Sequence, residues 1–294
     1  MASPTRKSDA LCLAGAALLA ALAIFSLFCG RYPLSPAGLL AGDEMQWRVF
    51  WTLRVSRTVV GVVGGFALGA AGFVYQTVFR NPLASPDVIG VSSGASAGAA
   101  AGILFLSGAA AVTASAFAGS LAAVGLALGL SALDRSGRHG TVVLAGIAVH
   151  ALAQTVLMCL KLTADPEREL ASIEYWIMGS LNGISGYSIG GSLALCAVCL
   201  AVLLAATLAV ACVVSLSGLI SFVGLLAPHG ARLLTRRNDR PTMLLGGLLG
   251  GVLLVGADIL ARSVAATELP VSIFTSLLGA PFLLYLIVRG RRHP

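Results

Sequence analysis

The segment GVSSG at residues 90–94 is where residue type and spacing come closest to covalent chemistry. It fits the G-x-S-x-G pattern of a hydrolase nucleophile elbow, in which a serine lies on a sharp turn between a strand and a helix. Asp134 and His150 follow in the order that such a triad requires. A proline-rich turn precedes the segment, however, and a long apolar run follows it, which is typical of a membrane helix. We therefore expect Ser92 and Ser93 to serve helix packing rather than hydrolysis.

Two pairs of polar residues lie inside apolar runs, four positions apart, so that one helical turn brings each pair onto a common face. Asp258 and Arg262 can neutralise each other, and a proton relay is the alternative. His150 and Gln154 are candidates for lining a translocation pathway, and hydrogen bonding to a neighbouring helix explains them equally well. Gln76 leaves the same two interpretations open.

The sequence indicates neither a metal site nor an ATPase site. Cys196 and Cys199 form a CxxC pair, but no second pair or histidine stands near them, which favours packing. His229 could act as a ligand, yet no cluster of histidines, cysteines or carboxylates surrounds it in the sequence. A Walker A loop requires G-x-x-x-x-G-K-[ST], and neither lysine of the chain, Lys7 or Lys161, is so placed. ATP hydrolysis by that route is therefore excluded for this chain alone.

The composition places the chain in a membrane. Apolar residues make up 57% of its 294 residues, charged residues make up 11%, and the mean hydropathy is +0.93. Soluble domains carry about 25% charged residues, so this chain cannot cover a water-exposed surface. The net charge of +7 comes from arginines in short interruptions between apolar runs. That distribution is typical of cytoplasmic loops under the positive-inside rule and does not indicate nucleic-acid binding.

The apolar runs predict an all-α fold: a single polytopic transmembrane bundle over residues 1–294 with about eight or nine spans, each needing about 20 residues. Arg6 and Lys7 precede the first run, which we interpret as a retained span with a cytoplasmic N-terminus. The predicted spans are 10–30, 55–79, 88–107, 109–133, 141–163, 187–214, 220–235, 242–264 and 272–289.

Glycines spaced four residues apart recur in these runs. An interior glycine costs a helix in water about 1 kcal/mol relative to alanine, but in lipid a stripe of small residues lets two helices pack backbone to backbone. We expect close helix packing along the stripes, which are Gly90, Gly94, Gly98 and Gly102; Gly61, Gly65 and Gly69; Gly125 and Gly129; and Gly246 and Gly250. A weak internal echo between GAAGFVYQTVFRNPLASP and SGLISFVGLLAPHGAR favours transport, because internal repeats are common in transporter folds.

Five segments resemble one family, in order along the chain. They are NPLASPDVIGVSSGA at 81–95, WIMGSL at 176–181, GLISFVGLLAPHGAR at 218–232, ADILAR at 257–262 and ELPVSIFTSLLGAPFLLYL at 268–286. All five are similar to segments of the permease subunits of bacterial iron-chelate, haem and cobalamin ABC importers, the FecCD type. Permeases of this family typically have ten spans.

The resemblance implies a transporter subunit in the bacterial inner membrane that does no covalent chemistry and holds no cofactor or metal. Its partners would be a second copy or a sister permease, two cytoplasmic ATPase subunits that bind ATP and Mg²⁺, and a periplasmic or lipid-anchored binding protein. The family-motif positions expected to act in packing or gating are Arg57, Gln76, Asn81, Pro82, Pro86, Gly90, Ser92, Gly94, Trp176, Gly179, Ser180, Gly218, Phe222, Gly224, Pro228, His229, Arg232, Asp258, Arg262, Glu268, Pro270 and Pro281.

One region departs from the family pattern. After WIMGSL, members usually have a cytoplasmic loop of the form LGEExARSLGV, which docks onto the ATPase, and then a further span. Here residues 187–224 contain no charged residue, and 187–214 is too short for two spans, which need at least about 34 residues. Relative to the pattern that the resemblance implies, roughly 40 residues are missing, including the docking loop.

The shortened region has a consequence for topology. If 187–214 forms one span, the basic turn 236–240 and the tail 289–292 fall outside the cell, against the positive-inside rule. Either the region 215–227 re-enters the membrane to compensate, or the chain is a coupling-impaired deletion variant. A hypothesis from another class is an ATP-independent secondary transporter, which would need buried acidic pairs or broken helices, and only Asp258 meets that description.

Overall fold

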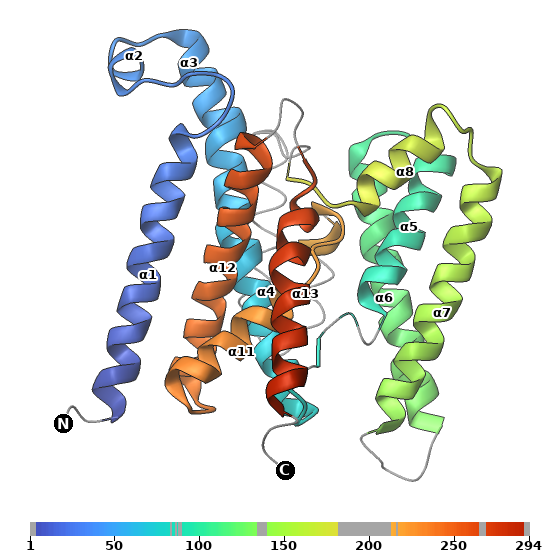
Figure 1. Ribbon diagram of the computed structural model, residues 1–294. Helices are drawn as coiled ribbons and strands as arrows, with labels where there is room; N and C mark the ends of the chain where they lie inside the picture. Colours follow the sequence, from blue (N-terminus) through green and yellow to red (C-terminus); the bar gives the residue numbers. More distant parts are fainter. Residues whose placement is uncertain are drawn as a thin grey trace. The chain divides into compact units, whose positions relative to one another are not determined.

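A computed structural model shows an arrangement of helices (Figure 1). The part of the chain that it describes is 4–82, 84–85, 87, 90–133, 140–181, 213–215, 217–264 and 269–290. Within these ranges every regular element is helical, which confirms the predicted fold class, and five helices are long and apolar enough to cross a membrane. The chain divides into two compact units, which are Met1–Phe73, Ser180–Ala194 and Ile220–Pro294 for the first, and Val74–Gly179 and Leu195–Leu219 for the second.

The first unit is built on three long helices: α1 (Pro4–Phe28), α4 (Ser56–Val78) and α12 (Arg240–Ser263). Helices α1 and α12 run parallel, because Cys12 contacts Pro241 at their starts and Ser26 contacts Arg262 near their ends. Helix α4 runs antiparallel to α12. The shorter helices of this unit are α2 (Pro36–Leu40), α3 (Glu44–Val49), the π-helix η1 (Phe50–Val55), α11 (Val223–Thr235) and α13 (Val271–Gly290).

The predicted glycine stripes of α4 and α12 pack against each other. A Cβ atom added at Gly65 would lie 2.4 Å from the carbonyl oxygen of Gly250, and one at Gly69 would lie 2.3 Å from that of Gly246. Only residues without side chains allow two helix backbones to approach this closely. At Gly61 the neighbour is the side chain of Val255 at 3.2 Å, so the stripe extends over three turns.

The helical segment that contains α4 starts well before the predicted span 55–79. The helical segment Glu44–Val78 has 35 residues and includes α3 and η1. It begins at Glu44 because the Asp43 side chain accepts hydrogen bonds from the backbone N–H groups of Met45 and Gln46, at 3.0 and 3.2 Å. The apolar run alone could not indicate this start, since the first turns carry charged and polar residues.

The basic segments of the first unit lie at one end of it. The Cys12 thiol donates to the carbonyl oxygen of Pro241 at 3.3 Å, and Lys7 and Arg237 line the same groove. The N-terminus of α1 and the basic turn 236–240 therefore lie at the same end of the first unit, which would place them on the same side of a membrane. This arrangement favours a location of that turn on the side of the N-terminus, as the positive-inside rule requires, over the outside location that follows if 187–214 forms one span.

Helix α11 is shorter than the predicted span 220–235. It has 13 residues and is bounded by Phe222 and Arg236, which both have left-handed backbones with φ of 67° and 54°. At 1.5 Å per residue it rises about 20 Å, less than the 30 Å of the hydrocarbon core. Most of the predicted span 187–214 lies outside the described residues, whereas α12 and α13 begin and end within two residues of the spans 242–264 and 272–289.

The second unit consists of α5 (Val91–Phe105), α6 (Ala109–Leu133), α7 (Gly140–Thr163) and α8 (Glu169–Ile177), together with the end of α4. Helix α6 has the bounds of the predicted span 109–133. Helix α5 is shorter than the predicted span 88–107, because Gly90 has φ of 85° and cannot be part of the helix.

Helices α5 and α6 pack through the predicted stripe of α5. Added Cβ atoms at Gly94 and Gly98 would lie 2.5 Å and 2.2 Å from the carbonyl oxygens of Gly119 and Ser115. The close packing expected for this stripe is thus confirmed, except at Gly90, which precedes the helix. The stripe at residues 125 and 129 behaves differently, since no described atom lies within 4 Å of a Cβ added at either glycine.

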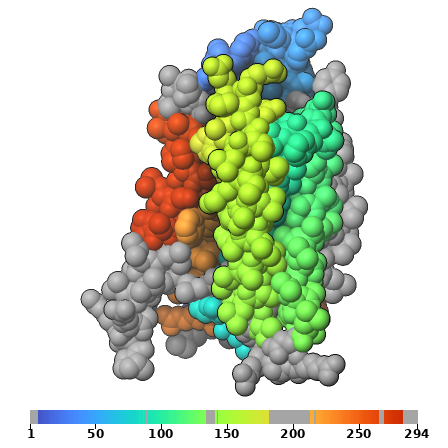
Figure 2. Space-filling model, turned by 90° about the vertical axis from the view of Figure 1, so that its right-hand side faces the viewer, coloured from blue at the N-terminus to red at the C-terminus, as the bar shows by residue number. Residues whose placement is uncertain are grey.

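Helix α7 presents an apolar face outward. Figure 2 shows it uncovered along its length, beside the green surface of α5 and α6. Its large exposed hydrophobic side chains recur with helical spacing, as expected for contact with lipid or with another apolar surface. They are Leu144, Ile147, Leu152, Val156, Met158 and Leu162.

Candidate functional site

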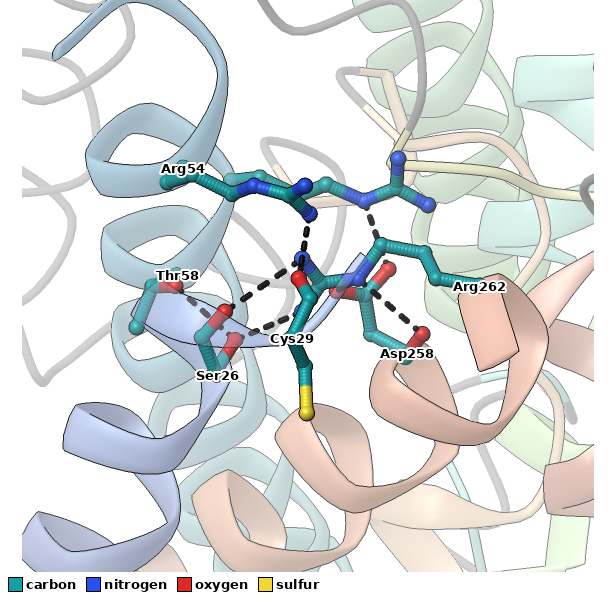
Figure 3. Close-up of polar contacts among 7 residues, drawn as sticks. Ser26, Cys29, Arg54, Thr58, Asp258 and Arg262 are labelled. Atoms are coloured by element: carbon teal, nitrogen blue, oxygen red, sulfur yellow. Dashed lines mark hydrogen bonds and ion pairs between the residues drawn. The ribbon is translucent and has the colours of Figure 1, made fainter. Parts of the chain in front are cut away.

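A buried cluster of charges joins the three long helices of the first unit at the end opposite the basic turn (Figure 3). Asp258 on α12 forms ion pairs with two arginines: Nε of Arg57 lies 2.8 Å from Oδ1, and Nε of Arg262 lies 3.0 Å from Oδ2. The side chains of all three residues are at most 7% exposed. Paired charges of this kind are stable away from water only while every partner is present.

The same cluster holds the C-terminal end of α1. Arg262 donates to the carbonyl oxygen of Cys29 at 3.1 Å and to the Ser26 hydroxyl at 2.6 Å, and Arg54 also donates to the Cys29 carbonyl. Ser26 in turn shares a hydrogen bond with Thr58 of α4, at 2.9 Å. Carbonyl groups at a helix C-terminus carry partial negative charge, so they are suitable partners for guanidinium groups. The cluster therefore ties α1 to α4 and α12.

The sequence predicted only part of this cluster. The pairing of Asp258 with Arg262 is confirmed, and no proton relay is needed to explain it. Arg57 was expected at a packing or gating position, but its contact with Asp258 joins residues 201 positions apart and could not be read from spacing. Arg54 was missed, although its position three residues before Arg57 places both on one helical face.

Helix α11 is held close to the end of α4 by motif residues. The Arg232 guanidinium lies 4.5 Å from the centre of the Phe73 ring and donates to the Phe73 carbonyl oxygen at 3.2 Å. A Cβ added at Gly72 would lie 1.7 Å from the carbonyl oxygen of Gly224. Phe222 directly precedes α11 and packs against Gly279 of α13. A Cβ added at Gly279 would lie 2.3 Å from the Cγ atom of the Phe222 side chain.

His229 is a half-buried polar side chain whose two ring nitrogens are shielded from solvent. Its ring lies edge-on to that of Phe282, with centroids 5.6 Å apart, and neither ring nitrogen has a hydrogen-bond partner among the described residues. Pro228 lies beside it within α11, and Pro281 interrupts α13 one position before Phe282. Among the described residues no group of three or more histidines, cysteines or carboxylates could hold a metal ion.

Two motif glycines of the second unit form a tight backbone crossing. Gly179 and Gly218 have φ of 71° and 72°, a conformation that favours glycine. A Cβ at Gly218 would lie 2.2 Å from the carbonyl oxygen of Trp176, and one at Gly179 would lie 2.2 Å from that of Leu219. The two segments can therefore cross only if both residues lack side chains. Ser180, which directly follows, is half-buried.

The serines of GVSSG lie in the first turn of α5 and bond to the residues just before it. Ser92 donates to the Asp87 carboxylate, and Ser93 donates to the Gly90 carbonyl oxygen at 3.0 Å. Neither hydrogen bond engages a histidine, and a helix rather than a strand precedes the turn. This geometry favours the packing interpretation over a nucleophile elbow, and Asp134 lies outside the described residues.

The remaining motif positions are spread over the chain. Asn81 and Pro82 lie in the exposed turn after α4, where the Asn81 carbonyl accepts from the Ala84 N–H at 3.0 Å, and Pro270 precedes α13. Gln76 is buried, with 3% of its surface exposed. Pro86, Glu268 and the CxxC pair of residues 196 and 199 lie outside the described residues.

The two pathway candidates lie on α7. His150 is exposed on the second unit and Gln154 is half-buried. Their spacing does place them on neighbouring positions of one helix face, but no contact of the described residues assigns either to a pathway, so that role stays a prediction.

The chain is similar to permeases over nearly all its length. The pattern of the FecCD transport family matches residues 18–206 and 197–289. The cobalamin import system permease protein BtuC of Halobacterium salinarum is 36% identical over 269 aligned positions, which cover 80% of this chain and 72% of that protein. The hemin transport system permease protein HmuU of Yersinia pestis is 33% identical over 317 positions, which cover 94% of each chain.

These alignments contain an internal gap. The alignment with HmuU has 317 positions but includes only 94% of the 294 residues of this chain, or about 276 residues. About 41 aligned positions of HmuU, the difference between 317 and 276, therefore have no counterpart in this chain. The two matches to the family pattern overlap at residues 197–206. A break in the pattern near these residues agrees with the shortened region that the sequence indicated after WIMGSL.

The fold is that of a known transporter. A solved structure described as an inward-facing conformation of a metal-chelate type ABC transporter superposes with a TM-score of 0.86 at 27% sequence identity. The superposition covers 96% of this chain and 99% of the other. Together with the matched motifs and the transmembrane helices, these similarities show that the chain belongs to the FecCD transport family of membrane permeases.

Proposed function

We propose that this chain is the membrane permease subunit of an ABC importer that moves a metal chelate, haem or cobalamin into the cell. The family match, which extends over both halves of the chain, is the observation that supports this most strongly. The cargo class is supported by the relatives, which are permeases for cobalamin and hemin and a metal-chelate type transporter. These cargoes share a bulky metal-containing ligand, which would be the substrate rather than a resident cofactor.

The proposal assigns energy coupling to partner proteins. Two ATPase subunits on the cytoplasmic side would bind ATP and Mg²⁺, and a periplasmic or lipid-anchored binding protein would deliver the cargo to a pair of permeases in the inner membrane. ATP can shift such an assembly between inward-facing and outward-facing states only if it binds the two states with different affinity. His150 and Gln154 are the side chains that we propose for the cargo pathway.

The first experiment is co-purification from membranes. The tagged chain is co-expressed with the ATPase and binding protein encoded beside its gene, and the eluted subunits are quantified. We expect equal amounts of permease and ATPase, and in proteoliposomes ATP-dependent uptake of one cargo from a panel of radiolabelled cobalamin, haem and ferric siderophores. ATP-independent uptake driven by an ion gradient would instead indicate a secondary transporter.

The internal gap supports a second candidate, a permease that assembles but is not coupled to ATP hydrolysis. About 41 positions present in HmuU are missing here, by the same alignment. In this case the folded chain would enter the membrane without recovering the ATPase. A chimera that receives the missing HmuU segment between residues 197 and 206 is the matched control, because it should regain ATPase binding only if that segment provides the docking surface.

A further inference from the structure

A groove opens between the start of α1 and the end of α11 in the first unit. It has a volume of about 420 Å³ and is lined by Lys7, Ser8 and Leu11 from α1 and by Leu234 and Arg237 from the other side. One part of the lining is cationic and another is apolar. Such a combination fits an amphiphile with an anionic head better than it fits an inorganic ion or a purely apolar chain.

The surroundings of the groove carry excess positive charge. Lys7 is exposed, and Arg236, Arg237 and Arg240 follow the end of α11. The carboxylates here are Asp9 and Asp239, and Asp239 is engaged with Nε of Arg237 at 2.6 Å. Four cations against two carboxylates leave a net charge of about +2 at this end, which the positive-inside rule places at the cytoplasmic surface.

The apolar part of the groove continues into the outer face of α1. Only 17% of the spanning window of α1 is buried, and Leu18, two turns beyond Leu11 on the same helix face, is exposed. Leu234 is 56% exposed at its edge. An acyl chain starting in the groove could therefore follow α1 along the membrane, whereas a free phosphate would leave these side chains without a partner.

We propose that this groove binds an anionic phospholipid of the inner leaflet, with the phosphate between Lys7 and Arg237 and an acyl chain along Leu11. Basic pockets between transmembrane helices at the cytoplasmic surface recognise anionic head groups in this way. The bound lipid would join α1 to α11, two helices that otherwise share few contacts, and would stabilise the folded chain because it binds the native state.

The test uses the full-length chain in detergent, to which phosphatidylglycerol, phosphatidylcholine or inorganic phosphate is added. Binding is measured by native mass spectrometry and the melting temperature by intrinsic fluorescence. We expect phosphatidylglycerol alone to bind and to raise the melting temperature. Lys7→Ala should weaken its binding about fivefold, and adding Arg237→Ala should weaken it further. Arg48→Ala, which removes an exposed cation of α3, is the control and should change nothing.

Three outcomes would overturn the proposal. Equal stabilisation by inorganic phosphate would indicate a free-anion site, and equal binding of phosphatidylcholine would indicate unselective contact with lipid. Unchanged binding by the Lys7→Ala variant would place the lipid elsewhere. If a variant does not fold, photo-crosslinking of the unaltered chain with a phosphatidylglycerol probe decides the matter: labelled peptides must include residues 7–11 or 234–237.

Discussion

Replacing Gly250 by alanine tests the close contact between α4 and α12. The added methyl group would lie 2.1 Å from the carbonyl oxygen of Gly65 and 3.1 Å from the Cα atom of Gly69. Ordinary contact begins at 3.4 Å, so the backbones must separate by about 1.3 Å, the difference between 3.4 and 2.1 Å. Both obstacles are backbone atoms, which cannot rotate away as a flexible side chain can.

The expected loss of stability follows from two opposing effects. Overpacking of a well-packed contact typically costs 1–3 kcal/mol, and replacing a helical glycine by alanine returns up to about 1 kcal/mol. We therefore expect Gly250→Ala to lower the free energy of unfolding by about 1–2 kcal/mol. At about 2–4 °C per kcal/mol, the melting temperature should fall by several degrees.

Gly256→Ala in the same helix is the matched control. No described atom lies within 4 Å of a Cβ added at Gly256, so only the gain in helix propensity applies and stability should stay equal or rise. Melting is measured by circular dichroism in lipid nanodiscs, where the native helix contacts persist. Equal melting temperatures for the two variants would refute the close approach of α4 and α12 that the structure shows.

Two further predictions concern charged groups of α12. Asp258→Asn leaves the guanidinium groups of Arg57 and Arg262 buried without their counter-ion, so the free energy of unfolding should fall by about 3–5 kcal/mol, and a loss below 1 kcal/mol in denaturant titration would contradict the cluster. Asp239 caps the start of α12, and hydrogen bonds, first from the side chain of Thr242, hold the pKa of its carboxyl below the ordinary value. A lowered pKa stabilises the fold above the unfolded-state value, about 3.9, and this contribution is lost as the pH falls through the folded-state value. The unaltered chain should thus melt above Asp239→Asn at neutral pH, and the difference should vanish in acid; a difference that persists at pH 2 would show that charge is not its cause.

The glycine spacing indicated which helix faces pack closely but not which helices meet. The stripe containing Gly65 and the one containing Gly250 are each visible in the sequence, yet their contact joins segments 185 positions apart. The stripe of residues 125 and 129 has the same spacing and meets no described atom within 4 Å. Spacing shows that a helix can be approached, whereas the partner depends on how the whole chain folds.

Helix bounds could be predicted where hydropathy changes sharply and not where a single side chain sets them. Helix α6 begins and ends with its apolar run. The helix containing α4 begins eleven residues before its run, because the Asp43 carboxylate caps a turn of polar residues. The candidate site shows the same limit: the pair Asp258 and Arg262 follows from one helical turn, but the contact with Arg57 depends on tertiary structure.

The start of α1 and the basic turn 236–240 lie together, and this limits which membrane spans the shortened region can have lost. Lys7 and Arg237 line one groove, which favours an even number of membrane crossings between them. Loss of the docking loop together with a single span would have moved Arg237 to the opposite side, unless part of the chain re-entered. Helix α11, which rises only about 20 Å, is too short to supply a full crossing by itself. We therefore predict that α12 and α13 keep their orientation despite the missing positions. Failure of the chain to recover its ATPase would then indicate the loss of a docking surface rather than an inverted fold.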